Sequence, residues 1–108
     1  MELDTQLKKG LIDVCVLAVL YRGDSYGWQV IKDLGSVIEI SESTLYPVLK
    51  RLGAAGHVTT YDVPHNGRLR RYFKITKSGE DRLRQFRQEQ FSLIRIYHYI
   101  NNSLKEGE

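Results

Sequence analysis

Cysteine, tryptophan, methionine and proline are scarce in this chain of 108 residues, which has one Cys, one Trp, one Met and two Pro. The single cysteine, Cys15, lies in the apolar run of residues 14–20, where a thiol behaves as a small hydrophobic side chain. One cysteine cannot form a disulfide within the chain. The composition therefore excludes a disulfide-stabilised fold and favours a reducing compartment, the cytoplasm.

Long hydrophobic runs are also missing. The run at residues 14–20 is far shorter than the roughly 20 apolar residues of a membrane-spanning helix, and no signal-peptide cleavage site follows it. With 42% apolar and 27% charged residues, the chain is too apolar for a disordered segment. We therefore expect one folded domain with no membrane association.

No set of residues suited to catalysis or metal binding can be assembled. His57, His65 and His98 are spread over three predicted elements, and only Asp62 lies near one of them, which is too few ligands for a metal. Cys15 has apolar neighbours, and no carboxylate pair marks a loop. We expect no enzyme activity, no metal site and no cofactor.

The net charge is small, but its distribution is uneven. The total is +3. Residues 1–40 carry −2 and residues 78–108 carry 0, whereas residues 41–77 hold seven basic and two acidic residues, a net +5. All the excess positive charge lies in the middle third, as in a localised nucleic-acid surface.

Helical spacing and punctuation predict two short helices first. The apolar residues within 4–21, beginning at Leu7, predict a buried helix, although its valines also suit a buried strand. Gly23 follows its end. Asp24 or Ser25 is expected to cap a second helix that ends near Gly35.

A third helix has two distinct faces. It is expected to begin at Ser41, with that hydroxyl as N-cap, and to close around Gly53 and Gly56. Its apolar stripe consists of Leu45, Val48, Leu49 and Leu52. The opposite face holds Ser43, Tyr46, Pro47, Lys50, Arg51 and Ala54. One face can anchor the helix while the other contacts base edges and phosphates.

Beyond Gly56 the apolar side chains recur at every second residue, as in a β-strand. Residues 58–63 and 69–75 predict two strands, joined by a turn at Asn66-Gly67, a dipeptide that tolerates positive φ. Alternation sends Arg71 to a different face from Tyr72. We therefore expect Arg71 either to contact nucleic-acid phosphates or bases or to pair with an acidic neighbour.

Thr76 is expected to cap a last helix of about 28 residues. Apolar or amide side chains recur there at alternating spacings of three and four: Leu83, Phe86, Gln90, Leu93, Tyr97, Ile100 and Leu104. A neighbouring stripe of Phe91, Ile94 and His98 widens this seam. Because so small a domain cannot cover this surface, we expect a homodimer; the alternative is a helix folded back on its own domain.

Three short helices, a basic hairpin and a long helix are the order of a winged helix-turn-helix. We expect an α+β fold, mainly α. Residues 1–76 would form the DNA-binding domain, and residues 77–108 a C-terminal dimerisation helix packed on the same core.

Four motifs also resemble a known family: Asp24-Ser25-Tyr26-Gly27, SESTLYPVLKRL at 41–52, Gly67-Arg68 with Arg71-Tyr72-Phe73, and Ile75-Thr76-Lys77-Ser78-Gly79. From about Leu7 to Glu80 the chain resembles the PadR-type bacterial transcriptional regulators, and its single C-terminal helix resembles their short subgroup. The resemblance implies a dimeric repressor that leaves its double-stranded DNA operator when a small molecule binds near the dimer interface.

The resemblance also implies residue roles. Ser43, Thr44, Tyr46, Pro47 and Lys50 match the recognition-helix motif, Tyr26 matches a backbone-contacting tyrosine, and Arg68 and Arg70 match the wing. Arg51 joins them as the basic neighbour of Lys50. The plainer alternatives are a solvated face for the two basic residues and half-buried packing for the two tyrosines. Pro47 removes a helical hydrogen bond at a cost of about 3 kcal/mol, and such exceptions occur mostly at functional sites.

The last helix lacks the tryptophan with which better-known members of that family stack on flat ligands. For a small aromatic or hydrophobic effector, Phe91, Tyr97 and Tyr99 remain as candidates, with Trp28 of the second helix, for which packing is the plainer role. A second hypothesis is a winged-helix module that sequesters a ligand or binds a protein without an operator. Ligand binding indifferent to the loss of Lys50 and Arg68 would distinguish it.

Overall fold

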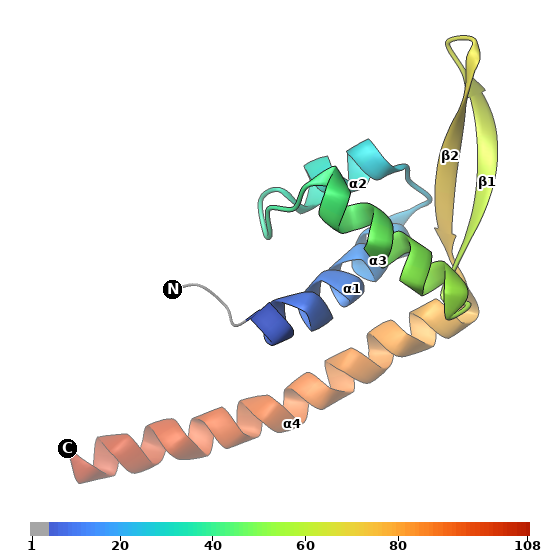
Figure 1. Cartoon of the computed structure of the whole chain (residues 1–108). Helices are drawn as coiled ribbons and strands as arrows, with labels where there is room; N and C mark the ends of the chain where they lie inside the picture. The colour runs from blue at the N-terminus through green and yellow to red at the C-terminus, as the bar shows by residue number, and fades with distance from the viewer. Residues whose placement is uncertain (1–4) are drawn as a thin grey trace.

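The computed structural model describes the backbone of residues 5–108 and the side chains of residues 10–108. The predicted place of Leu7 on the apolar face of the first helix lies outside the described side chains. In chain order the elements are α1 (Thr5–Arg22), α2 (Gly27–Leu34), α3 (Glu42–Ala54), β1 (Val58–His65), β2 (Arg68–Ile75) and α4 (Lys77–Gly107). Figure 1 shows α1 to α3 grouped together, the hairpin standing at one end of this group, and α4 running back from the foot of the hairpin below α1.

The core lies among the first three helices and the foot of the hairpin. Its largest fully buried side chains are Leu17, Leu20, Leu45, Val16 and Val30. Val58 and Phe73 extend it into the hairpin, and Leu83 of α4 packs against it. The predicted inward stripe of α3 is confirmed, because all four of its members are buried. The strand alternative for the first segment is wrong, since α1 is helical.

The hairpin matches its predicted turn. β1 and β2 pair antiparallel from Val58 opposite Ile75 to His65 opposite Arg68. Asn66 and Gly67 both have positive φ, at 50° and 77°. The dipeptide was expected to tolerate this geometry, which suits the twist of a two-residue hairpin turn.

The predicted cap of α2 is wrong. The N-cap residue is Tyr26, with no side-chain cap bond. Asp24 instead accepts a hydrogen bond from the Tyr61 hydroxyl, and the Ser25 backbone pairs with Phe73 in both directions, at 3.2 and 2.7 Å. Both candidate caps are thus held by the hairpin, a long-range contact that overrides the local preference.

The other two caps occupy their predicted positions. Ser41 is the N-cap of α3, but its hydroxyl bonds the hydroxyls of Ser43 and Thr44 rather than a backbone amide. Thr76 caps α4 by accepting from the Gly79 amide at 3.2 Å. α4 has 31 residues and is therefore about 46 Å long at 1.5 Å per residue. Among the residues described, no helix is long and apolar enough to span a bilayer.

Candidate nucleic-acid interface

The outward face of α3 is the first part of the candidate interface. Ser43, Thr44, Tyr46, Pro47 and Lys50 are all exposed, while the opposite face of the helix is buried in the core. The core contacts therefore fix the orientation of the helix, and the five predicted contact residues remain accessible to a partner.

Tyr46 links α3 to the start of α2. Its side chain is about half exposed, and its hydroxyl lies so close to Gly27 that a Cβ added there would be 3.0 Å from it. Gly27 therefore gives the ring room to lie against α2. The predicted packing alternative for Tyr46 is in part correct, because the residue both packs and presents a surface.

A ladder of aromatic rings attaches the hairpin to α2. The Arg70 guanidinium lies 4.0 Å from the centre of the Tyr26 ring, Tyr26 meets Tyr72 edge-on at 5.5 Å, and Tyr72 stacks on Tyr61 at 5.6 Å. Asp24 ends the ladder by accepting from the Tyr61 hydroxyl at 2.6 Å. Cation–π and stacking contacts of this kind each stabilise by about 0.5 to 1.5 kcal/mol.

The tyrosine ladder was not predicted as a unit. Tyr61 and Tyr72 lie opposite each other on β1 and β2, so this contact follows from the strand pairing alone. Placing Tyr26 against them requires the tertiary structure. The hydrogen bond to Asp24, followed by burial and the charge of Asp24, raises the pKa of the Tyr61 hydroxyl above its ordinary value.

The basic residues divide into paired and unpaired groups. Arg51 binds Asp13 of α1 with two hydrogen bonds, of 2.6 and 3.2 Å, and this partner raises the pKa of the guanidinium. Arg71 pairs with Asp62 at 3.5 Å across the hairpin, as one of its two predicted alternatives required. Lys50 and Arg68 are exposed and have no ion-pair partner among the residues the structure describes.

The helix α3 and the hairpin border a common hollow. Tyr26, Trp28 and Gly27 of the α2 segment line it together with Glu42 and Tyr46 of α3 and Arg70, Arg71 and Phe73 of β2. Tyr26, Tyr46 and Arg70, predicted from separate motifs, thus lie on one surface. Arg68 lies beyond them at the hairpin tip, opposite His65.

The candidate effector residues are not brought together. Trp28 is 56% exposed on α2, with the Lys32 ammonium 5.1 Å from its ring, and it borders the hollow beside α3. Phe91, Tyr97 and Tyr99 are exposed on α4 instead. No group of three potential metal ligands occurs within residues covered by the structure.

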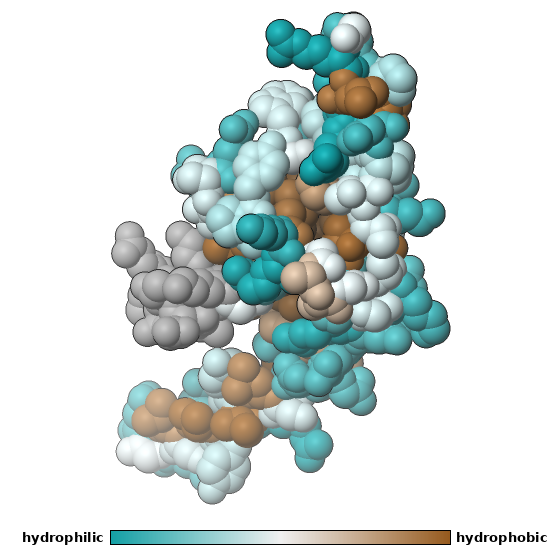
Figure 2. All heavy atoms as spheres, turned by 45° about the vertical axis from the view of Figure 1, so that its right-hand side comes forward, coloured by the Kyte–Doolittle hydropathy of each residue, from teal (hydrophilic) through white to brown (hydrophobic). Residues whose placement is uncertain are grey.

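The predicted seam follows α4 away from the core. Leu83 packs on the core of its own chain, and Phe86, Gln90 and Leu93 are partly buried. Tyr97, Ile100 and Leu104 are about half exposed, and Figure 2 shows hydrophobic side chains gathered along the rod of α4. The first turns therefore belong to the domain, while the remainder of the seam lies open.

Three helices on one core, the third with its outward face exposed, followed by a basic hairpin define a winged helix-turn-helix protein. The sequence matches the transcriptional regulator PadR-like family over residues 16–85. The chain therefore belongs to the PadR-like family of transcriptional regulators, rather than to a family of enzymes.

Solved structures agree with this assignment. A PadR-like transcription factor from Bacteroides fragilis is 28% identical with a TM-score of 0.80, over 89% of this chain and 95% of that one. A protein from Streptococcus mutans is 38% identical with a TM-score of 0.70, over 82% of each chain. Bacillus subtilis PadR, solved in complex with operator DNA, shares the fold at 21% identity and a TM-score of 0.66, over 70% of this chain and 46% of that one. The comparison with curated protein sequences found no match.

Proposed function

We propose that this protein is a homodimeric, sequence-specific repressor that binds double-stranded DNA in the cytoplasm and leaves it when a small molecule binds. The observation that carries the DNA-binding role is the common surface of Tyr26, Tyr46 and Arg70. Lys50 on α3 and Arg68 on β2 add two exposed charges without an ion-pair partner in the described part of the chain. The operator complex of Bacillus subtilis PadR supports it by analogy of fold.

Each element has a distinct role in this proposal. Ser43, Thr44, Tyr46, Pro47 and Lys50 on α3 read the major groove, since short polar and basic side chains suit base edges and phosphates. Tyr26, Arg68 and Arg70 contact the flanking backbone. Arg51 acts through Asp13 by holding α3 on α1, so it orients the helix rather than reading DNA.

The dimer would form through residues 77–108, continuing the domain of residues 1–76. The open part of the α4 seam offers Tyr97, Ile100 and Leu104 to a second copy. Two recognition helices would then read half-sites about 34 Å apart, or a multiple of this distance, in a roughly palindromic operator. Phe91, Tyr97 and Tyr99 lie along the same helix and are the effector candidates beside such an interface.

The test compares two variants in mobility-shift titrations on the DNA upstream of the protein's own gene. Lys50→Ala combined with Arg70→Ala should weaken binding at least about 30-fold, because each lost contact is worth roughly 1 to 3 kcal/mol. Arg71→Ala removes one charge that Asp62 already neutralises and should cost less than about threefold. Unchanged binding by the double variant would contradict the assigned residues and favour a ligand-sequestering module.

A further inference from the structure

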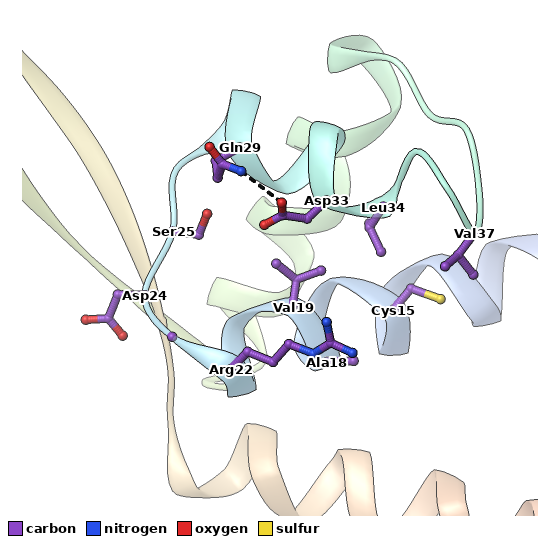
Figure 3. Close-up of a pocket in the computed structure, with 11 residues that line it drawn as sticks. Cys15, Ala18, Val19, Arg22, Asp24, Ser25, Gln29, Asp33, Leu34 and Val37 are labelled. Carbon is purple, nitrogen blue, oxygen red and sulfur yellow. Dashed lines mark hydrogen bonds between the residues drawn. The ribbon is translucent and has the colours of Figure 1, made fainter.

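A cavity separates the second half of α1 from α2, away from the α4 seam. Its volume is about 380 Å³, within the size range of small-molecule sites. Cys15 and Val19 of α1 face Leu34 of α2 and Val37 across it, and Figure 3 shows Gln29 and Asp33 on the α2 side with Arg22 on the α1 side. The floor is therefore apolar and the rim polar.

The hydroxyl of Ser25 is the unusual group in this cavity. Ser25 is 6% exposed and lines the cavity, yet its Oγ has no hydrogen-bond partner among the described residues. Buried hydroxyls in native proteins nearly always have a partner, because an unpaired one costs about 1 to 3 kcal/mol. A bound molecule with a hydrogen-bonding group would satisfy it.

The charges at the rim select the sign of that molecule. Of the two carboxylates at the rim, Asp24 turns away from the cavity to accept from Tyr61, whereas Asp33 turns toward it, with Arg22 as the one basic residue of the lining (Figure 3). Asp33 accepts from Gln29 at 2.8 Å through Oδ1, and its second oxygen can accept another donor. On the α2 side of the cavity, this free oxygen of Asp33 favours a cationic donor over an anion.

We infer that this cavity binds a small aromatic amine, with its ring against Cys15, Val19 and Leu34 and its ammonium group directed to Asp33 and the Ser25 hydroxyl. Such a ligand matches the apolar floor, the unpaired hydroxyl and the Asp33 carboxylate together. The site lies within one chain, so it is distinct from an effector site formed by α4 at a dimer interface.

Two residues that line this cavity, Asp24 and Ser25, also hold the β1–β2 hairpin in place. Asp24 accepts from Tyr61 of β1, and the Ser25 backbone exchanges two hydrogen bonds with Phe73 of β2. A ligand that bonds the Ser25 hydroxyl therefore changes the support that the Asp24-Ser25 segment gives to the hairpin. This step rests on the proposed function. If the DNA-bound and DNA-free forms of the protein differ in their affinity for the ligand, ligand binding changes operator affinity by the same factor.

Cys15 provides the readout, because it is the chain's single cysteine and lines the cavity. Burial raises the pKa of its thiol, so its reaction with N-ethylmaleimide in the free protein is slow and easily followed. Tryptamine should slow this alkylation at millimolar concentration. The neutral analogue tryptophol should protect at least about threefold less well, and the anion indole-3-propionate least.

Three variants of the full chain locate the effect. Ser25→Ala should weaken tryptamine protection about fivefold, the value of one hydrogen bond, while leaving the thermal midpoint of the free protein equal or higher. Asp33→Asn should weaken it about threefold. Glu89→Gln, which removes an exposed carboxylate on α4, should leave it unchanged.

Two results would overturn the inference: no protection of Cys15 by tryptamine, or equal protection in wild type, Ser25→Ala and Asp33→Asn. Equal protection by all three indole compounds would overturn the assigned ligand charge. Failure of the unliganded protein to bind DNA would contradict the proposed function alone, because Cys15 protection is measured without DNA.

Discussion

Pro47 is the residue of α3 that its own helix least tolerates. It lies inside Glu42–Ala54 and is exposed, so no core contact compensates for the amide it lacks. Pro47→Ala should therefore raise the free energy of unfolding by up to about 3 kcal/mol while weakening operator binding. Urea unfolding and mobility shift measure the two effects. Lower stability in the variant would mean that the proline serves the fold rather than the interface.

Arg51 shows why residue roles are harder to predict than residue exposure. Helical periodicity correctly places it on the outward side of α3 beside Lys50. Its partner Asp13 lies 38 positions earlier on another helix, and no local pattern connects the two. Arg71, in contrast, pairs with the residue directly opposite it in the hairpin, so strand register already contained that contact.

The position of the β1–β2 hairpin depends on the tyrosine ladder. Tyr61→Phe removes the hydrogen bond to Asp24 and should loosen the hairpin, with weaker operator binding as the result. Tyr99→Phe, a change on the exposed part of α4, is the matched control and should leave binding unchanged. Equal effects of the two changes on mobility shift would exclude a role for this contact.

The same contact has a pH signature. Because the Asp24 hydrogen bond raises the pKa of Tyr61 in the folded state, its stabilising effect is complete below the unfolded pKa of about 10 and is lost as pH rises through the folded value. The tyrosinate absorbance of wild type minus Tyr61→Phe should therefore titrate above pH 10. Asp24→Asn should return this titration toward the ordinary value.

The start of α4 requires glycine at position 79. A Cβ there would collide with the carbonyl oxygen of His57, so Gly79→Ala should lower the free energy of unfolding by about 1 to 3 kcal/mol. Gly10→Ala is the matched control, because a Cβ at that helical position meets nothing within 4 Å and should stabilise by about 0.5 to 1 kcal/mol. Thermal unfolding compares them, and a neutral Gly79→Ala would mean that the helix start can shift.

At this scale, local patterns predicted the elements well because each carries its own signal. The α3 stripe, the Asn66-Gly67 turn and the Thr76 cap all depend on neighbours in the chain. The cap of α2 could not be predicted this way. Asp24 and Ser25 are good capping residues, but contacts with β1 and β2, distant in sequence, bind both of them.

The whole molecule is elongated, with extents of 66, 28 and 21 Å, because α4 continues beyond the core. Truncation after Arg87 removes the open part of the seam but keeps Leu83, which packs on the core. Light scattering should therefore find the full chain as a dimer and the truncated chain as a monomer or aggregate. A stable truncated dimer would contradict dimerisation through α4.

Charge is the property of the whole molecule on which the proposed function depends. The net +5 of residues 41–77 lies in α3 and the hairpin, so a dimer would carry two separated basic surfaces. The most direct test is operator affinity measured by mobility shift at several salt concentrations. If each half neutralises about three to five phosphates, the log–log slope should lie between about −5 and −9. A slope near zero would contradict DNA binding by these surfaces.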